Sequence, residues 1–378
     1  MQKTVLPPNY IGILGGGQLG MMLAKVARQF GYKIAILEPD IECPAKIYAD
    51  VLINKPYDDK LALDELAKIT QVITTEFENV PAASVEYLNN ITPVYPSANS
   101  LLIAQNRIKE KTFFRSIGLM TADFAVIYDE SDCDFISADM FPAILKTTTL
   151  GYDGKGQATV HSHDDLKEIY IKIGGECILE KRIKLKQEVS IIVARNQTGS
   201  KVFPLIENQH RNGILDVSYI PAHVDKEIHK LAHDAALKIV DGLDYTGLLT
   251  IEFFITEDNQ LLVNEMAPRP HNSGHITIET SITSQFEQQF RAVCGLPLGS
   301  TELKQCGAML NLLGDIWLDN TINPEQILLT MFPDAKYHSY GKKVAKEARK
   351  MAHISLTSDD RSYLESSMSE LQVKLKIN

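Results

Sequence analysis

Cysteine is scarce in this sequence, and long apolar runs are missing from it. The 378 residues include five cysteines, and no two of them form a C-x-x-C pair. This usage argues against a zinc knuckle or a disulfide framework and suits a reducing cytoplasm. No apolar stretch approaches the roughly 18 residues of a membrane-spanning helix, and the first residues lack the features of a signal peptide. We therefore expect a cytoplasmic protein that is neither exported nor inserted in a membrane.

Positive charge is also in short supply. Lys and Arg number 38 against 48 Asp and Glu, so the formal net charge is −10. Non-specific binding to nucleic acid needs clustered Lys and Arg, so we expect no nucleic-acid partner. An anionic ligand must instead be met by a few cationic side chains in a local pocket.

The rest of the composition is that of a globular protein, with 44% apolar and 23% charged residues. A single hydrophobic core rarely grows beyond roughly 250 to 300 residues. A chain of 378 residues therefore predicts two or three domains.

The first hundred residues have the pattern of a parallel sheet with helices on its faces. An apolar strand at Tyr10–Leu14 leads into the string GGGQLG, a helix at Met21–Phe30 and a strand at Lys33–Leu37. This alternation of strands and helices continues along the next segment and is typical of α/β domains. We place the first domain at residues 1–97.

Beyond residue 98 strands outnumber helices. We predict strands for FPAILKTTT, CILEKRI and KQEVSIIVAR, then the helix HKLAHDAALKIVDGL and a hairpin of GLLTIEFFIT and LLVNEMAPRP. Such an order favours an α+β arrangement with antiparallel pairing. We place a second domain at 98–305 and a third at 306–378, where short strands and a basic patch precede a polar helix.

The string GGGQLG contains Gly15, Gly17 and Gly20 in the spacing G-x-G-x-x-G between a strand and a helix. Backbone N–H groups at such a helix N-terminus can hold an anion closely. With Glu38 at the end of the next strand, the motif fits an NAD site. It fits equally a site for a single phosphate, or a tight turn without a ligand.

A second glycine-rich loop, GYDGKGQ, spans Gly151–Gln157 and follows a strand that ends near Lys146. It has no P-loop spacing. Its backbone N–H groups and its lysine can close over phosphates as a flap, with Lys146 as a point charge. The alternative is a simple hairpin turn, because D-G and G-K-G form turns.

The hairpin carries two carboxylates. If Asp258 and Asn259 form its turn, Glu252 and Glu265 lie directly opposite and share a face. Facing carboxylates need a cation between them, and magnesium binds oxygen ligands and completes its shell with substrate phosphates. The alternatives are an exposed pair, or a buried pair that shares a proton or pairs with Arg269.

Together these strings resemble the ATP-grasp ligases, and closely the N5-carboxyaminoimidazole ribonucleotide synthetases of purine biosynthesis. The resemblance covers nearly the whole chain and rests on GGGQLG, TTEFENVP, AQNRIKEK, ILKTTTLGYDGKGQ, EVSIIVAR, NQHRNGIL, NEMAPRPHNSGHITIE and SQFEQQFRAVCGLPLG. It implies α/β and α+β architecture: a Rossmann-like N-terminal domain, a central ATP-grasp domain with a mobile lid at about 115–185, and a small C-terminal domain.

The resemblance implies an ATP site between two antiparallel sheets, with the flap over the phosphates. Magnesium, or manganese, would bind Glu252 and Glu265. The positions that match nucleotide-binding residues of the family are Arg107, Lys146, Gly151, Tyr152, Asp153, Gly154, Lys155, Gly156, Gln157, Glu180, Lys181, Arg182, Ile183, Glu188, His210, Asn264 and Glu265.

It also implies a reaction in which ATP, bicarbonate and 5-aminoimidazole ribonucleotide give N5-carboxyaminoimidazole ribonucleotide through carboxyphosphate. The matching catalytic candidates are Arg269, His271, Asn272, Tyr152 and Asp153. Ser273 and His275 would contact the substrate. Its phosphate would meet Gly17, Gln18, Leu19, Lys342 and Arg349.

Two positions depart from the family pattern. Ile276 stands where an aromatic residue is frequent, and Ala352 where glycine is frequent. We expect the first change to loosen substrate stacking and the second to restrict the approach of the backbone to a phosphate.

Other classes remain open. A formate-dependent glycinamide ribonucleotide transformylase shares the glycine-rich opening and the metal hairpin, and an NAD-dependent dehydrogenase would explain GGGQLG and Glu38 alone. A non-catalytic nucleotide-binding module would tolerate loss of either glutamate. The resemblance further implies a homodimer and a functional hand-over of product to the mutase that moves the carboxyl group to carbon.

Overall fold

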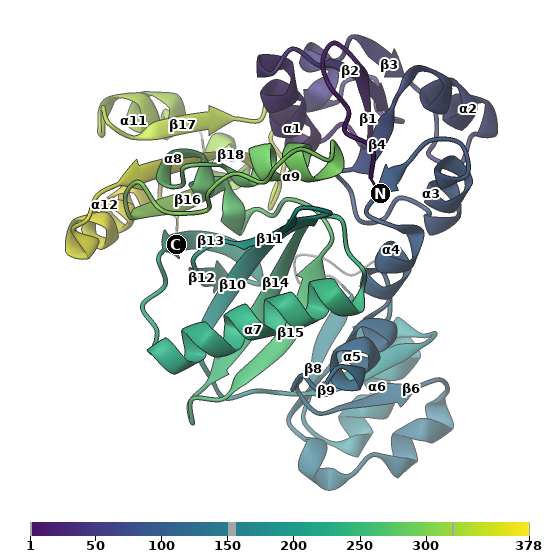
Figure 1. The fold of residues 1–378 in the computed structure, drawn as a ribbon. Coiled ribbons are helices and arrows are strands. Elements are labelled where there is room, and N and C mark those ends of the chain that lie inside the picture. Colours follow the sequence, from purple (N-terminus) through teal and green to yellow (C-terminus); the bar gives the residue numbers. More distant parts are fainter. Residues whose placement is uncertain (1, 150–155, 320, 378) are drawn as a thin grey trace.

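The computed structural model describes residues 2–149, 156–319 and 321–377. Within them the chain forms three sheets (Figure 1). The first is parallel, with strand order β3-β2-β1-β4-β5, and its strands are β1 (Tyr10–Leu14), β2 (Lys33–Leu37), β3 (Val51–Ile53), β4 (Val72–Thr75) and β5 (Val94–Tyr95). Apolar strand residues meet apolar helix faces on both sides, and the helices are α1 (Gln18–Gln29), α2 (Lys60–Ile69), α3 (Ala82–Asn89) and the 3-10 helix η1 (Pro44–Tyr48).

The second sheet is antiparallel and small, with strand order β6-β9-β7-β8. Helices α4 (Ala98–Ala104) and α5 (Arg107–Ser116) lead into it, and its elements are β6 (Phe124–Ile127), η2 (Glu130–Phe135), η3 (Ala138–Met140), β7 (Ala143–Thr147), β8 (Gln157–Val160), α6 (His163–Ile173) and β9 (Cys177–Lys181). Leu145 and Leu179 belong to an apolar cluster with α6. Because side chains alternate along a strand, Lys146 and Glu180 lie on the opposite face.

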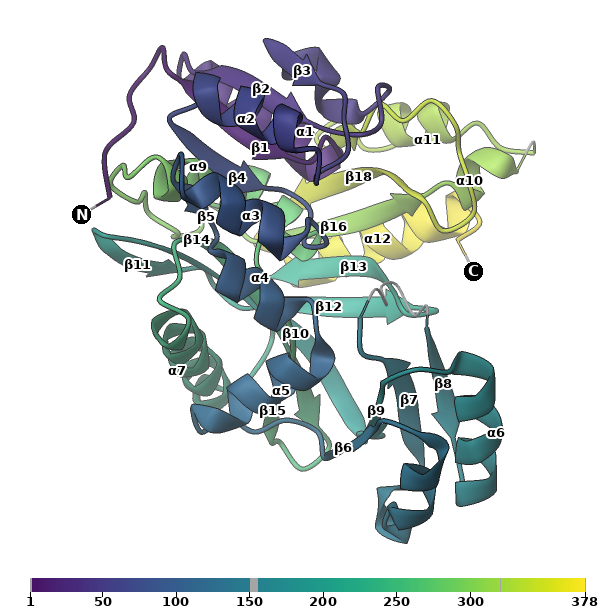
Figure 2. The ribbon, with the colours of Figure 1, turned by 90° about the vertical axis from the view of Figure 1, so that its right-hand side faces the viewer.

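The third sheet has nine strands in the order β15-β14-β10-β12-β13-β16-β18-β17, with β11 beside β10. Its strands are β10 (Leu185–Asn196), β11 (Gly199–Val202), β12 (Ile206–Arg211), β13 (Ile214–Ile220), β14 (Gly247–Thr256), β15 (Leu261–Ala267), β16 (Gly307–Leu313), β17 (Lys336–Ser339) and β18 (Lys350–Thr357). Since β13 pairs with β16, the sheet continues past the domain boundary expected at 305/306 (Figure 2). The other helices are η4 (Ser273–Ile276), α7 (Lys226–Gly242), α8 (Thr277–Thr280), α9 (Gln285–Val293), α10 (Asp315–Leu318), α11 (Pro324–Thr330) and α12 (Arg361–Lys374).

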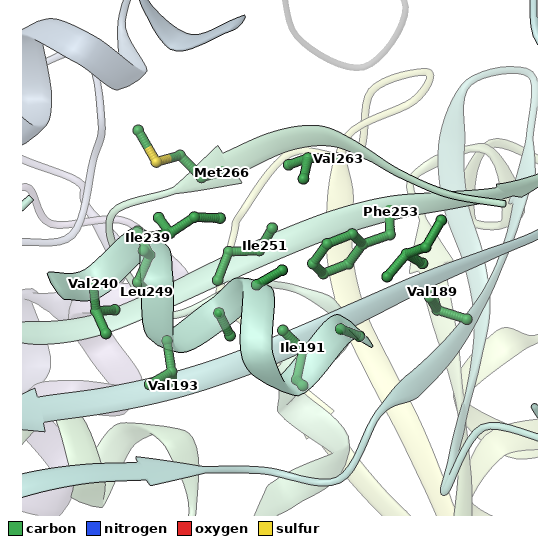
Figure 3. Close-up of a cluster of buried hydrophobic side chains, with 14 of the residues drawn as sticks. Val189, Ile191, Val193, Ile239, Val240, Leu249, Ile251, Phe253, Val263 and Met266 are labelled. Atoms are coloured by element: carbon green, nitrogen blue, oxygen red, sulfur yellow. The ribbon is translucent and has the colours of Figure 1, made fainter. Parts of the chain in front are cut away.

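One face of the third sheet is covered by α7, which lies across β10, β14 and β15 (Figure 1). In Figure 3 Ile239 and Val240 of this helix face Val193, Leu249 and Ile251 of the strands. These strand residues occupy alternate positions, so the residues between them lie on the other face. That face carries Glu188, Ser190 and Glu252, and it holds the site described below.

The parallel first sheet and the two antiparallel sheets confirm the predicted mixture of α/β and α+β structure. Among the helices of the described residues, none is both long and apolar enough to cross a membrane.

Candidate active site

The centre of the site is the carboxylate pair of the β14/β15 hairpin. Glu252 and Glu265 are register partners, as predicted. The side chain of Glu252 is 14% exposed, and Glu265, although surrounded by protein atoms that desolvate it, keeps solvent-accessible surface. The pair therefore lies at a surface that a ligand can reach.

The register arises differently from the prediction. Thr256 and Gln260 close the hairpin around a three-residue loop in which Asn259 has φ of 60°. This loop shifts the pairing by one residue relative to a two-residue turn. A bulge at Asn264, between the pairs Phe253–Val263 and Glu252–Glu265, shifts it back. The two departures cancel, so the two glutamates still face each other.

The surrounding charges act differently on the two carboxylates. Burial would raise the pKa of Glu252, but His271, His210 and Arg269 outweigh it and lower this pKa to about 2. Desolvation and the charge of Glu252 raise the pKa of Glu265. Donors and positive charges of the protein thus favour the ionised form of Glu252, whereas at Glu265 the nearby Lys146, Arg107 and Lys111 do not outweigh burial and the charge of Glu252.

A third carboxyl group, Glu110, adjoins the pair and is affected by its charge. Glu110 of α5 is 3% exposed and accepts a hydrogen bond of 2.8 Å from the Met266 backbone N–H. Burial and the neighbouring Glu265 raise its pKa to about 8. Among the described residues no group of three or more His, Cys, Asp or Glu is placed to bind a metal alone. Two carboxylates supply only part of the coordination shell of a magnesium ion. Phosphate oxygens of a substrate can supply the rest.

Two lysines converge on the polar face of the second sheet, at Glu180 of β9. Lys146 Nζ lies 3.1 Å and Lys111 Nζ lies 3.3 Å from Glu180 Oε2. Lys111 of α5 also donates to the Asn264 carbonyl at 2.8 Å, so it links Glu180 of the second sheet to the hairpin. The two cations and Glu180 thus form a buried network beside the carboxylate pair.

Three other predicted nucleotide residues lie near this network. Arg107, at the start of α5, donates to the Thr147 carbonyl at 2.8 Å. Across the sheet face, His210 Nδ1 lies 2.5 Å from Glu188 Oε2. Burial alone would lower the pKa of His210, but Glu188, Glu252 and Glu265 raise it, so it adds positive charge to this end of the site.

The predicted nucleotide-binding residues Lys181, Arg182 and Ile183 line a groove. Its volume is about 1380 Å³, and its other walls are residues 119–123 and the hairpin end at 256–260. A space of this size can accommodate a nucleotide base and ribose.

Part of the predicted flap, Gly151, Tyr152, Asp153, Gly154 and Lys155, lies outside the described residues. Gly156 has φ of 70°, and its carbonyl accepts from the Thr147 N–H. Gln157 pairs with Lys146 in β8 and β7.

Arg269 pairs with Glu78 rather than with the hairpin glutamates. The guanidinium lowers the pKa of Glu78 to about 2, against the effect of burial. The alternative in which Arg269 replaces a metal between Glu252 and Glu265 is therefore not supported. Its side chain is 17% exposed and lies near enough to Glu252 to lower that pKa.

The residues after Arg269 differ in what they can contact. His271 Nε2 lies 3.0 Å from Glu252 Oε1. Asn272 is 7% exposed, and neither polar atom of its side chain has a hydrogen-bond partner in the described part of the chain. Ser273 and His275 have no exposed surface, so direct substrate contact by these two side chains, which the resemblance implied, is not supported.

The loop at Gly15–Gly20 already holds an anion that belongs to the chain. Gly17 N–H donates to Glu76 Oε1 at 2.7 Å, and Gly20 N–H donates to Glu76 Oε2 at 3.0 Å. Gly16 N–H donates to Glu38 Oε2 at 2.7 Å. The expected phosphate cradle of Gly17, Gln18 and Leu19 thus lacks its Gly17 donor.

The same contacts exclude the dehydrogenase interpretation. Glu38 faces inward, where its carboxylate accepts from Gly16, from the Asp40 N–H and from the Tyr57 hydroxyl. A ribose-binding acid would have to face the ligand instead.

The predicted cations of the C-terminal segment lie in the stretch between β17 and β18. Lys342 donates to the Lys350 carbonyl and Arg349 to the Val344 carbonyl. Lys343 pairs with Glu42, which connects this segment to the first sheet unit.

The two departures from the family pattern have structural explanations. Ile276 is fully buried in an apolar cluster with Ile192 and Met309. Ala352 is fully buried in another cluster with Leu310. Both side chains pack in the interior, and the effect of the two changes on substrate binding stays a prediction.

Several central residues had no assigned role at the sequence level, namely Glu76, Glu78, Glu110 and Lys111. They occur in the strings TTEFENVP and AQNRIKEK, which marked the resemblance. Their place in these strings was the available signal, but nothing in the sequence indicated which distant partners they meet.

Comparison with known protein families covers most of the chain. Residues 9–105 match the ribonucleotide synthetase preATP-grasp domain, residues 112–286 the ATP-grasp domain, and residues 307–367 the phosphoribosylaminoimidazole carboxylase C-terminal domain.

Individual relatives agree with this assignment. The N5-carboxyaminoimidazole ribonucleotide synthase of Bacillus subtilis is 43% identical over 94% of this chain and 93% of its own length. The crystal structure of an ADP complex of an N5-carboxyaminoimidazole ribonucleotide synthetase has a TM-score of 0.92 at 39% identity, covering 99% and 98% of the two chains. The Aspergillus clavatus enzyme in complex with ADP and 5-aminoimidazole ribonucleotide has a TM-score of 0.91 at 29% identity, covering 98% and 99%. The chain therefore belongs to the N5-carboxyaminoimidazole ribonucleotide synthase family of ATP-grasp ligases in purine biosynthesis.

Proposed function

We propose that this chain performs the reaction of its family at the face of Glu252 and Glu265. ATP, bicarbonate and 5-aminoimidazole ribonucleotide give ADP, phosphate and N5-carboxyaminoimidazole ribonucleotide. The observation that carries the proposal is a carboxylate pair in which the protein's positive charges do not outweigh burial and repulsion at Glu265, adjacent to the lysine network at Glu180. Such a site accepts a metal and triphosphate together.

For the nucleotide, Lys146 and Arg107 would contact phosphate oxygens, while Glu180–Ile183 would border the adenine. Glu188 would meet the ribose, with His210 alongside. Glu252 and Glu265 would hold magnesium or manganese, which supplies positive charge for the transferred phosphoryl group. The Lys111–Glu180 contact supports this assignment because it fixes Lys146 beside the hairpin.

For the carboxyl transfer, Arg269, His271 and Asn272 would hold bicarbonate and its phosphorylated product. Bicarbonate oxygen attacks the γ-phosphorus, ADP leaves, and the carboxyphosphate that results is attacked at carbon by the exocyclic amine with loss of phosphate. Asn272 supports this because its buried amide has both polar atoms without a partner among the described residues. The flap with Tyr152 and Asp153 would exclude water from the intermediate.

For the ribonucleotide phosphate, we retain Lys342 and Arg349 as the proposed cations. Both precede β18, and the neighbouring Lys343–Glu42 pair brings this segment to the N-terminal unit. We infer a minor part for Gln18 and Leu19, since the Gly17 N–H is used by Glu76.

The function is tested by ADP release from purified protein supplied with ATP and magnesium. We expect release to require both 5-aminoimidazole ribonucleotide and bicarbonate. The proposal fails if release is independent of the imidazole substrate. A requirement for formate and glycinamide ribonucleotide would instead identify the transformylase.

We further propose a homodimer, with product passed to the mutase, and domains at residues 1–97, 98–305 and 306–378 with a lid at about 115–185. Two-fold assemblies are the commonest among soluble enzymes. Sedimentation of the protein tests the homodimer, and conversion of its product by added mutase tests the hand-over.

A further inference from the structure

The ring of His271 is held by a chain of buried polar groups that crosses three strands. His271 Nδ1 lies 2.9 Å from Ser273 Oγ, which lies 2.9 Å from Ser190 Oγ of β10. Asn208 Nδ2 of β12 donates to Ser190 Oγ at 2.9 Å. Ser218 of β13 donates to Asn208 Oδ1, also at 2.9 Å.

These groups lie in the interior of the sheet. Ser190, Ser218 and Ser273 have no exposed surface, and Asn208 is 5% exposed. Burying a hydroxyl or an amide is costly unless it is hydrogen-bonded, and apolar residues could fill the same volume without that cost. A connected polar chain that ends on a site residue therefore calls for a role at that residue.

The backbone of His271 is fixed separately. Its N–H donates to Gln285 Oε1 at 2.9 Å, and its carbonyl accepts from Gln285 Nε2 at 2.8 Å. A side chain at Gly274 would collide with Gln285, since a Cβ there would lie 2.3 Å from Oε1. With the backbone clamped by Gln285, the serine chain is left to control the ring.

Both ends of the chain set the same direction of hydrogen bonding. At the ring, the Ser273 backbone N–H points at His271 Nδ1 from 3.4 Å, and an N–H can only donate, so Nδ1 accepts. Ser273 then gives its one hydroxyl proton to Nδ1, so Ser190 supplies the proton between the two serines and accepts from Asn208, which is the direction found at the far end. The remaining ring proton is then on Nε2, opposite the Glu252 carboxylate at 3.0 Å.

We propose that Ser273, Ser190 and Asn208 are positioning residues that hold His271 as the tautomer with its proton on Nε2. In this form Nε2 donates to Glu252 or to an oxygen of an anionic ligand. The other tautomer would turn a lone pair toward these oxygens and repel them. The structural part stands alone, and only its catalytic consequence rests on the proposed function.

The tautomer is read directly by nitrogen NMR. Full-length protein labelled with ¹⁵N at histidine is measured without ligands at about pH 8, where an ordinary imidazole is neutral. The His271 signals are assigned by their loss in His271→Gln. We expect the two ring nitrogens to report Nε2–H in the unmodified protein. A proton on Nδ1 would overturn the proposal.

Two variants test the chain itself. Ser273→Ala removes the donor next to the ring. Asn208→Asp replaces a donor by a group that only accepts, so Ser190 and Ser273 must turn round. We expect both to raise the Nδ1–H population of His271, and Asn208→Asp more strongly. An unchanged tautomer in both folded variants contradicts the proposal.

The matched control is Ser355→Ala. Ser355 is also fully buried, but its hydroxyl has no hydrogen-bond partner among the described residues. We expect this control to keep the His271 tautomer and kcat, whereas Ser273→Ala lowers kcat roughly tenfold to hundredfold with an unchanged KM for ATP. An equal loss in both variants would indicate a packing effect and overturn the positioning role. A shifted tautomer with normal kcat would refute the catalytic consequence alone.

Discussion

Two sets of carboxylates in this molecule have opposite environments. Glu76 is 8% exposed and accepts two backbone N–H groups at the start of α1. Glu252 and Glu265 face each other across two strands, and the protein's positive charges outweigh burial at Glu252 but not at Glu265. Glu76 finds its hydrogen-bond partners within the chain, whereas the Glu252–Glu265 pair needs a cation from outside the chain. Burial alone therefore does not identify a site, and the balance of partners does.

This contrast reverses the order in which local sequence motifs would rank the two regions as ligand sites. The string GGGQLG has the spacing of a ligand loop, but its donors are spent on Glu76 and Glu38. The hairpin has no glycine-rich motif, yet at its Glu265 the protein's positive charges do not outweigh burial and repulsion. Breaking one member of each set should therefore affect activity in one case and stability in the other.

The largest effect is expected for Glu265→Gln. Loss of one of two metal-binding carboxylates should reduce ADP formation on the order of a hundredfold or more. Stability should be unchanged or slightly higher, because a repulsion with Glu252 is removed. Turnover at saturating magnesium and urea unfolding measure the two quantities. Near-normal turnover would remove the metal assignment.

The next effect is a loss of stability in Glu76→Ala. This change leaves the Gly17 and Gly20 N–H groups without an acceptor and opens a cavity. We expect the free energy of unfolding to fall by about 2 to 4 kcal/mol. Urea unfolding monitored by circular dichroism measures it. If stability stays unchanged while activity is lost, Glu76 belongs with the site carboxylates and the comparison fails.

A buried pair of histidines extends the comparison of buried polar groups to the pH dependence of stability. His275 and His353 are fully buried with ring centroids 4.9 Å apart, and burial lowers the pKa of both well below the ordinary value. The unfolded chain therefore binds more protons, so their contribution to stability is lost as pH falls through about 6.5. The raised pKa values of Glu110 and Glu265 act in the opposite direction, so a difference between variants is needed.

The comparison is between the unmodified protein and His353→Asn, which removes one titrating group. Between pH 6.5 and 5.5 the unmodified protein should lose about 1 kcal/mol more than the variant. Urea midpoints at the two pH values measure this. Parallel pH profiles would show that His353 has the same pKa in the folded and the unfolded protein.

The sequence was sufficient for the architecture and for the carboxylate pair. Alternation of strands and helices predicted the parallel sheet, and alternation along the strands predicted that Glu252 and Glu265 share a face. The hairpin loop was predicted incorrectly, because a left-handed Asn259 and a bulge at Asn264 compensate each other. Local spacing cannot reveal such cancellation.

The sequence was insufficient wherever a residue acts through a distant partner. The Glu76 contacts join positions 59 and 56 residues apart, and the Lys111–Asn264 contact joins positions 153 apart. His275 lies in the same string as His271, yet η4 turns it into the interior, where it contacts Gln285. Such outcomes depend on tertiary packing, which no short motif contains.

The smallest effect is expected for Glu38→Gln. Glu38 is the partly exposed carboxylate that accepts hydrogen bonds beside the glycine-rich loop. Glu38 is only partly buried, and its carboxylate accepts from Gly16, Asp40 and Tyr57. An amide places one donor against these donors, so we expect a loss of about 1 kcal/mol in unfolding free energy. Because no ligand contacts this carboxylate in our assignment, kcat and the KM for ATP should stay unchanged. A raised KM for ATP or for the ribonucleotide would place Glu38 at the substrate and return the glycine loop to the active site.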